Sequence, residues 1–122
     1  TTTSNMKSTK KIYCFDIDGV ICTTKKKNYS RSKPNKKVIE IINQLYMKNK
    51  VIIFTARYMG RNKENISIAK KQGYKLTYNQ LIKWGLKFDE LRFGKPTFDV
   101  YVDDKNFLFK KKWYIEFSKK YL

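Results

Sequence analysis

The stretch YCFDIDGVI, residues 13–21, places two carboxylates, Asp16 and Asp18, directly after an apolar run. Neighbouring acids repel each other and resist burial, so their position at the end of a buried segment calls for a reason. Residues 12–17 (IYCFDI) are rich in β-branched and aromatic side chains, in a continuous rather than alternating run, which predicts a central parallel strand covered on both faces. Side chains two apart in an extended segment point the same way, so Asp16 and Asp18 can converge on one ligand.

The segments that follow this strand predict a βαβ unit. Residues 23–33 are polar and basic and are expected to form a loop. Apolar side chains then recur at helical spacing from Pro34 to about Asn49, and VIIF at 51–54 is a second buried strand. Strand, helix and strand in this order predict an α/β fold with a mainly parallel sheet.

The second half of the chain predicts further alternation. Residues 62–72 are expected to form a short helix ended by Gly73, and Thr77 is expected to cap a second helix that stops at Gly85. The other predicted elements are strands at 88–93 and 98–102 and a helix over 108–121 with Trp113, Phe117 and Tyr121 on its inner stripe.

The expected fold is a Rossmann-like three-layer sandwich with a sheet of about four strands. The chain has 122 residues, 41% of them hydrophobic, which suits one compact domain over residues 11–122. Residues 1–10 are expected to be a disordered segment or, in part, a remnant of the expression tag.

The chain is strongly basic. Lys and Arg number 28 against 10 Asp and Glu, which gives a formal charge of +18. Such a charge invites a nucleic-acid partner. The basic residues are nevertheless spread in short runs along the chain, so a solvated surface is favoured over a dedicated polyanion groove, and nucleic acid is the less favoured partner.

The two cysteines, Cys14 and Cys22, are too few for a disulfide framework, and Cys14 is expected to be buried in the first strand. A reducing cytoplasm is the simplest location. No run reaches the roughly 18 apolar residues of a membrane span, so no membrane partner is expected.

A second pair of acids, Asp103 and Asp104, follows the last predicted strand. The carboxyl ends of parallel strands share one edge of the sheet, and ligands bind there in open α/β sheets. A divalent cation would relieve the repulsion of the four carboxylates, and oxygen ligands suit Mg²⁺. The chain has no histidine, which disfavours a zinc site or a histidine-dependent triad.

Two further residues fit phosphate chemistry at this edge. Thr55 directly follows strand 51–54, where its hydroxyl and nearby N–H groups could hold phosphate oxygens. Lys95, in the turn GKP, offers a positive charge that an anionic phosphate and a nucleophilic carboxylate would need.

Four motifs then carry a resemblance to a known family. They are FDIDGV (15–20), FTAR (54–57), GKP (94–96) and VDD (102–104). Their order and strand-end placement resemble the four motifs of the haloacid dehalogenase (HAD) superfamily of phosphohydrolases, over about residues 11–110. The resemblance implies a HAD-like fold and a Mg²⁺-dependent phosphatase.

The resemblance also implies a role for each motif residue. Asp16 would be the nucleophile that forms an aspartyl-phosphate. Asp18 would protonate the leaving alcohol and then activate water, and an Asp rather than a Thr at this position favours a phosphatase over a phosphotransfer ATPase. Thr55 would bind the phosphoryl group, and Lys95 would pair with that group and with Asp16.

For the metal, the resemblance implies a shared set of ligands. Mg²⁺ would be held by the Asp16 carboxylate, the Asp18 backbone carbonyl and one or both of Asp103 and Asp104. Which of the last two contacts the metal directly is left open.

A narrower likeness concerns FTARYMGR (54–61), WGLKFDELRFGKP (84–96) and DDKNF (103–107). These stretches look like small bacterial phosphatases linked to capsule or other surface-polysaccharide biosynthesis. That likeness implies a phosphorylated sugar or small polyol as the substrate.

The loop after Thr55 supplies three candidate substrate-binding residues, Ala56, Arg57 and Arg61. The two arginines could meet a second anionic group of the substrate. A loop arginine in solvent or in a structural ion pair is an equally weighted alternative.

Members of the superfamily often carry a cap domain, but the segments between Asp18 and Pro34 and between Thr55 and Lys95 are too short for one. An open site is therefore expected. It could take a large substrate, be covered by a neighbouring subunit of a homo-oligomer, or be closed by the basic flap at 23–33. Candidate contacts on that flap are Tyr29 and Arg31.

Three functions of different classes are therefore considered. The leading one is a phosphomonoesterase acting on a small phosphate ester. The second is a phosphatase acting on a nucleic-acid end or a phosphoprotein, for which the open site and the charge are the evidence. The third is a noncatalytic polyanion-binding module, against which the complete set of acids speaks. Nucleic-acid binding that falls steeply with salt and competes with turnover would favour the second.

Overall fold

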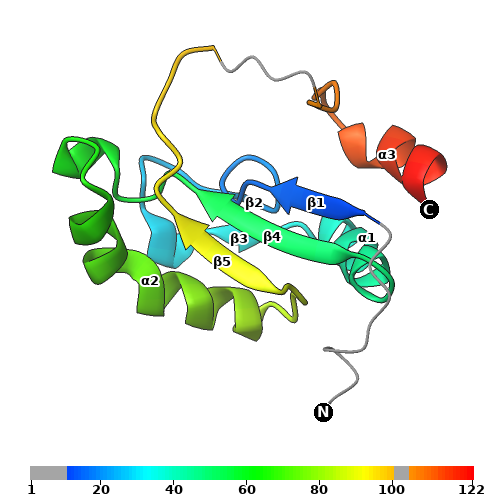
Figure 1. Cartoon of the computed structure of the whole chain (residues 1–122), viewed down its shortest axis with the longest axis horizontal. Coiled ribbons are helices and arrows are strands. Elements are labelled where there is room, and N and C mark those ends of the chain that lie inside the picture. The colour runs from blue at the N-terminus through cyan, green and yellow to red at the C-terminus, as the bar shows by residue number, and fades with distance from the viewer. Residues whose placement is uncertain (1–10, 101–104) are drawn as a thin grey trace.

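The computed structural model describes residues 11–100 and 105–122, so the N-terminal segment 1–10 and the acids Asp103 and Asp104 lie outside the described residues. Its central element is a parallel sheet in the order β1-β4-β5. The strands are β1 (Ile12–Phe15), β4 (Lys50–Thr55) and β5 (Glu90–Phe93). All three arrowheads point to the same edge in Figure 1, and the loops that follow the strands gather there.

The helix α1 (Lys36–Tyr46) completes the predicted βαβ unit between β1 and β4. Asn35 caps it, because its side-chain oxygen accepts hydrogen bonds from the backbone N–H groups of Lys37 and Val38. Its apolar stripe packs into the core with the middle of β4, where Val51 and Ile53 are fully buried.

The two helices predicted between residues 62 and 84 are wrong, because the structure has one continuous helix, α2 (Ile66–Lys83). Gly73 does not end a helix. It lies in the middle of α2, where a Cβ atom would collide with the ring of Tyr58. Thr77 is likewise buried in the helix interior rather than at a cap, and its hydroxyl accepts a hydrogen bond from Arg57. Tertiary packing thus overrides two local stop-and-start signals.

The segment predicted as a plain loop at 23–33 contains regular structure. Strands β2 (Cys22–Thr23) and β3 (Lys33–Pro34) pair in antiparallel fashion, and a short 3-10 helix, η1 (Tyr29–Arg31), lies between them. A second 3-10 helix, η2 (Gly60–Asn62), follows β4. Both 3-10 helices stand near the carboxyl edge of the sheet, and η1 contacts α2.

Only one face of the sheet packs into the core that the described helices share. Phe15 and Phe93 point to this face, where they meet Phe117 of α3 and Tyr74 of α2. On the opposite face Ile12 is 65% exposed and Cys14 is exposed, contrary to the expected burial of that thiol. Within residues 11–100 and 105–122, the elements therefore form two layers rather than the expected three.

The last helix, α3 (Trp113–Tyr121), confirms the predicted C-terminal helix over 113–121 but begins five residues later than expected. Of its predicted stripe, Trp113 and Phe117 are buried and Tyr121 is partly buried. The strand predicted at 98–102 is not observed over its described part, 98–100, and the rest lies outside the described residues. The structure is thus a small α/β fold with a mostly parallel three-stranded sheet and three helices.

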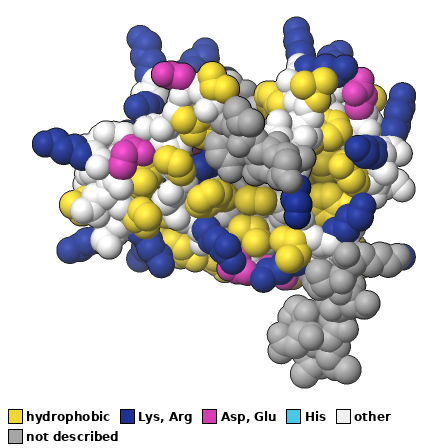
Figure 2. Space-filling view, turned by 45° about the horizontal axis from the view of Figure 1, so that its top comes forward, with side chains coloured by type: hydrophobic (Ala, Val, Ile, Leu, Met, Phe, Trp, Pro, Cys, Tyr) yellow, Lys and Arg dark blue, Asp and Glu magenta, His cyan; other side chains and the backbone are white. Residues whose placement is uncertain are grey.

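Two surface properties bear on function. Figure 2 shows Lys and Arg side chains spread around the outline of the visible face, with few acids between them. Across the described part of the chain, no helix is both long enough and apolar enough to cross a lipid bilayer.

Candidate active site

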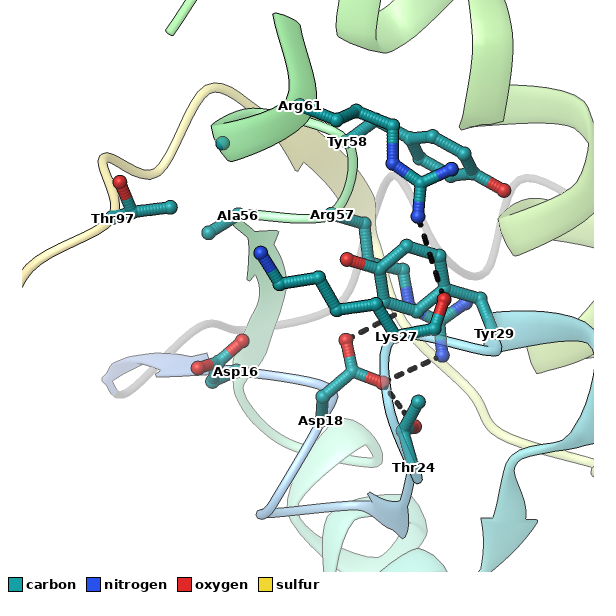
Figure 3. A pocket seen from close by; sticks show the side chains of 11 residues that line it. Asp16, Asp18, Thr24, Lys27, Tyr29, Ala56, Arg57, Tyr58, Arg61 and Thr97 are labelled. Atoms are coloured by element: carbon teal, nitrogen blue, oxygen red, sulfur yellow. Dashed lines mark hydrogen bonds and ion pairs between the residues drawn. The ribbon is translucent and has the colours of Figure 1, made fainter. Parts of the chain in front are cut away.

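A pocket of about 240 Å³ opens at the carboxyl edge of the sheet (Figure 3). Its walls come from four places: the end of β1, the turn before η1, the loop after β4 with η2, and the segment after β5. The lining residues are Asp16, Asp18, Thr24, Lys27, Tyr29, Ala56, Arg57, Tyr58, Gly60, Arg61 and Thr97. The two acids that the sequence singles out therefore share one cavity.

Asp16 is held at both carboxylate oxygens. Its Oδ1 accepts a 2.7 Å hydrogen bond from the backbone N–H of Ile17, and its Oδ2 accepts a 3.0 Å hydrogen bond from Nζ of Lys95. Lys95 lies 79 residues further along the chain and is carried to this place by the turn after β5. The side chain of Asp16 remains 30% exposed, so it is accessible from the pocket.

The charge state of Asp16 reflects opposing influences. Burial raises the pKa of the Asp16 carboxyl above its ordinary value, and the nearby carboxylate of Asp18 raises it further. The ammonium of Lys95 and the N–H of Ile17 act in the opposite direction without cancelling the effect of burial. The folded chain thus disfavours the ionised form of Asp16 relative to water, in spite of its ion pair with Lys95.

Asp18 is turned toward Arg57 and the β2–β3 ribbon. Nε of Arg57 donates to Oδ2, and Nη2 donates to Oδ1, each at 2.9 Å. Oδ1 also accepts a hydrogen bond from the Thr24 hydroxyl and a weak one from the Cys22 thiol. Because Oδ2 accepts only the bond from Arg57 among the described residues, it is the oxygen of Asp18 with spare acceptor capacity.

Arg57 is buried, with 1% of its surface exposed, and each of its five side-chain N–H donors has a partner. Besides the two bonds to Asp18, Nη1 donates to Gln80 at 2.7 Å and to Thr77 at 3.4 Å, and Nη2 donates to Ser32 at 3.3 Å. Of the two alternatives left open for Arg57, the structure therefore shows the structural ion pair. No donor is left over for a substrate.

The network around Arg57 joins distant parts of the chain. Gln80 of α2 accepts from Arg57 and donates from Nε2 to the backbone oxygen of Tyr29 in η1. The ring of Tyr29 lies under the guanidinium, 4.7 Å from its carbon. Sequence reasoning missed Thr24, Ser32 and Gln80, because nothing local marks a side chain whose partner is fixed only by the fold.

Thr55 lies at the end of β4 but is completely buried and is not among the residues that line the pocket. Its hydroxyl accepts a hydrogen bond from the N–H of Arg57, and its carbonyl accepts one from the N–H of Lys95. It therefore links the two loops that carry these cations. Ala56, the next residue, does line the pocket.

Of the flap residues, Tyr29 lines the pocket, whereas Arg31 is exposed and is not part of the lining. Arg61 lines the pocket from η2, on the side away from the acids (Figure 3). Lys27 and Tyr58 complete this wall, and neither was singled out by sequence reasoning.

The expected metal ligands can be assessed in part. Asp16 and Asp18 offer hard oxygen donors in one pocket, a donor set that fits Mg²⁺. Asp103 and Asp104 lie outside the described residues, and within the described ones no group of three or more ligating side chains forms. The donor chemistry present fits a cation that keeps several waters of its own.

No protein-family model and no curated protein matches the chain. Among solved structures, the crystal structure of a target protein from Vibrio cholerae is similar, with a TM-score of 0.74 and 22% sequence identity. The match covers 90% of this chain and 98% of that chain. At this level of identity the similarity shows the shared fold, a small α/β domain.

Proposed function

We propose that the chain is a Mg²⁺-dependent phosphomonoesterase of HAD type, with Asp16 as its nucleophile. The observation that carries this proposal is the 3.0 Å contact between Lys95 Nζ and Oδ2 of Asp16, an acid that lines the same pocket as Asp18. Lys95 contacts Asp16, and Asp18 lies nearby at the carboxyl edge of the parallel sheet. This arrangement suits the attack of a carboxylate on a phosphate. The four HAD-like motifs support the same chemistry.

In the proposed first step, a carboxylate oxygen of Asp16 attacks phosphorus. The bond between phosphorus and the ester oxygen breaks, and that oxygen leaves with its electron pair. Asp18 donates a proton to the leaving oxygen. Its Oδ2 is the atom proposed to hold this proton, because Oδ2 accepts one hydrogen bond, from Arg57, whereas Oδ1 accepts bonds from Arg57, Thr24 and Cys22. The products are an aspartyl-phosphate and an alcohol.

In the second step, Asp18 takes a proton from a water molecule, which attacks phosphorus and releases inorganic phosphate from Asp16. Lys95 stabilises the negative charge on Asp16 and on the phosphoryl oxygens throughout. Thr55 supports this arrangement by holding the backbone N–H groups of Arg57 and Lys95. Bound Mg²⁺ would supply charge neutralisation of the phosphoryl group and of the carboxylates.

The proposed substrate is a small phosphorylated metabolite such as a sugar or polyol phosphate. The proposed role of the enzyme is in surface-polysaccharide biosynthesis. The support for this substrate is the narrower sequence likeness together with the size of the pocket, about 240 Å³. The location proposed is the cytoplasm, since both cysteines are thiols rather than a disulfide.

A screen for phosphate release tests the proposal. It compares sugar phosphates, polyol phosphates, nucleotides, 5′-phosphorylated oligonucleotides and phosphopeptides, each with Mg²⁺ and with a chelator. We expect Mg²⁺-dependent release from a small ester and its loss in Asp16→Asn. Undiminished turnover in Asp16→Asn would remove the nucleophile assignment.

Two further outcomes are informative. Asp18→Asn should severely reduce turnover and allow phosphoenzyme to accumulate, because the second step lacks its base. Preference for oligonucleotides, lost steeply with added salt, would instead favour the nucleic-acid alternative.

A further inference from the structure

One wall of the pocket is cationic and aromatic. It is formed by Lys27, Tyr29, Tyr58 and Arg61, which we call the distal wall. In Figure 3 the amine of Lys27 points into the pocket above the acids, while Arg61 lies beside the ring of Tyr58. The wall is therefore placed to meet the part of a substrate that lies beyond the phosphate attached at Asp16.

Arg61 is held in a defined orientation although it is exposed. Its guanidinium carbon lies 4.7 Å from the ring centre of Tyr58 and 5.5 Å from that of Tyr29. Nη2 also donates to the backbone oxygen of Lys27 at 3.5 Å. A planar guanidinium that is already oriented loses little freedom on binding, and its remaining donors match the oxygens of a carboxylate or a phosphate.

The backbone of the distal wall is strained. Lys27, its neighbour Lys26 and Tyr58 have φ values of 58°, 51° and 66°, in the left-handed region that side chains other than glycine rarely adopt. Such conformations persist only where the surroundings impose them, and they cluster at binding sites. Here they turn Lys27 and Tyr58 into the pocket lining.

The two cations that contact the acids, Lys95 and Arg57, are already paired. Lys95 pairs with Asp16, and Arg57 pairs with Asp18. For Lys27 and Arg61, by contrast, the described residues provide no carboxylate within ion-pair distance. Glu64, the acid of the same loop, instead accepts hydrogen bonds from the backbone and the hydroxyl of Thr97.

We propose that Lys27 and Arg61 bind a second anionic group on the leaving group of the substrate. The preferred substrate is then a phosphate monoester that carries a second negative charge, either a carboxylate or a second phosphate. This inference rests on the proposed function. The sequence suggested that Arg57 and Arg61 meet a second anionic group, and here Lys27 takes the place of Arg57. The ring faces of Tyr29 and Tyr58 keep Arg61 in place and border the apolar part of the substrate.

Matched substrate pairs test this inference. Glycerol 3-phosphate and 3-phosphoglycerate differ in one carboxylate, and fructose 6-phosphate and fructose 1,6-bisphosphate differ in one phosphate. We expect the wild-type chain to favour the doubly anionic member of a pair by at least about tenfold in kcat/KM. The pair in which this preference occurs identifies the second anion.

The variants Lys27→Met and Arg61→Met should each reduce this preference to less than about threefold, mainly through a higher KM for the doubly anionic ester. Lys48→Met removes one exposed lysine away from the pocket and serves as the matched control, which should keep the full preference. Raising the salt concentration should weaken the preference in the wild-type chain and in Lys48→Met, and should have little further effect in Lys27→Met and Arg61→Met.

A binding measurement separates this inference from the proposed function. Calorimetry on Asp16→Asn gives the dissociation constants of both members of a pair without turnover. Asp16→Asn should bind the doubly anionic ester more tightly, and the double variant Asp16→Asn/Lys27→Met should lose this difference. That result supports anion binding by the distal wall even if no phosphate release is detected. Equal affinities of the two members, or a preference that survives both Lys27→Met and Arg61→Met, would overturn the inference while leaving the phosphatase proposal standing.

Discussion

Arg57 and Asp18 form a two-point ion pair, with both nitrogen–oxygen distances at 2.9 Å, across 39 residues of sequence. The arginine follows β4 and the acid follows β1, so the pair ties together the ends of two neighbouring strands. Through Gln80 it also ties both strand ends to α2. The orientation of the proposed acid and base is therefore set by a buried residue whose N–H donors are all engaged within the protein.

Removing Arg57 should destabilise the fold. Arg57→Met leaves Asp18 without its buried partner and leaves Gln80 and Thr77 without a donor. We expect a loss of about 2 to 4 kcal/mol in the free energy of unfolding, below the upper range for buried pairs because Asp18 is 28% exposed. Urea denaturation measures this loss in the free energy of unfolding. Arg92→Met is the matched control, since the exposed pair of Arg92 with Glu90 should contribute less than about 1 kcal/mol. Equal losses in the two variants would contradict the role of Arg57.

A more conservative change should separate the effect of Arg57 on the orientation of Asp18 from its effect on the stability of the fold. Arg57→Lys keeps the charge but cannot hold both oxygens of Asp18, so the carboxylate is free to turn. We expect kcat to fall by roughly 10- to 100-fold, while KM changes less than about threefold. Ser32→Ala, which removes only the 3.3 Å bond to Nη2, should have a much smaller effect. A change in KM alone would place Arg57 in binding rather than in orientation.

Asp16 should reduce the stability of the chain at neutral pH when no cation is bound. Burial raises its pKa in the folded state, so folding disfavours the ionised form. The cost is full above the folded-state pKa, and it is relieved as the pH falls through that pKa to below the unfolded value of about 3.9. Asp16→Asn should therefore be more stable than wild type at pH 7 in chelator, with the difference shrinking toward about pH 4. Urea titrations at both pH values measure this difference, and a less stable variant at pH 7 would oppose it.

The candidate site could be located from sequence because its signal is local. An apolar run that ends in Asp16 and Asp18, followed by a βαβ pattern, places the acids at one edge of a parallel sheet. The same topology brings Lys95 to Asp16, although no sequence pattern gives the distance between them. The sequence pattern predicts the edge of the sheet at which the acids lie. The contact between Lys95 and Asp16 at that edge depends on how the folded chain packs.

The missed features depend on contacts between distant segments. The strands of the β2–β3 ribbon have two residues each, too few for any periodicity to show. Gly73 has the local chemistry of a helix end, yet the ring of Tyr58 occupies the space beside it and the helix continues. The role of Arg57 is hidden for the same reason, since only the folded chain supplies partners for all five of its donors.

The position of Gly73 can be tested directly. Gly73→Ala raises helix propensity by about 1 kcal/mol but puts a methyl group into the ring of Tyr58. We expect a net destabilisation of about 1 to 3 kcal/mol, measured by urea denaturation. Tyr58→Ala in the same chain should remove the clash, so that adding Gly73→Ala to it becomes neutral or stabilising. A stabilising effect of Gly73→Ala alone would show that Tyr58 moves away at little cost.

The two thiols should differ sharply in reactivity, and this difference reports on the accessibility of the sheet face that carries Cys14. Cys14 is exposed on that face, whereas Cys22 is 3% exposed and its pKa is raised, chiefly by burial. Because the thiolate is the reactive form, a chromogenic disulfide reagent at pH 8 should modify one thiol quickly and the second only after denaturation. Cys14→Ser should abolish the fast phase, and Cys22→Ser should retain it. A slow reaction at Cys14 in the native chain would mean that this face is covered in solution, by a second copy or by a segment outside the described residues.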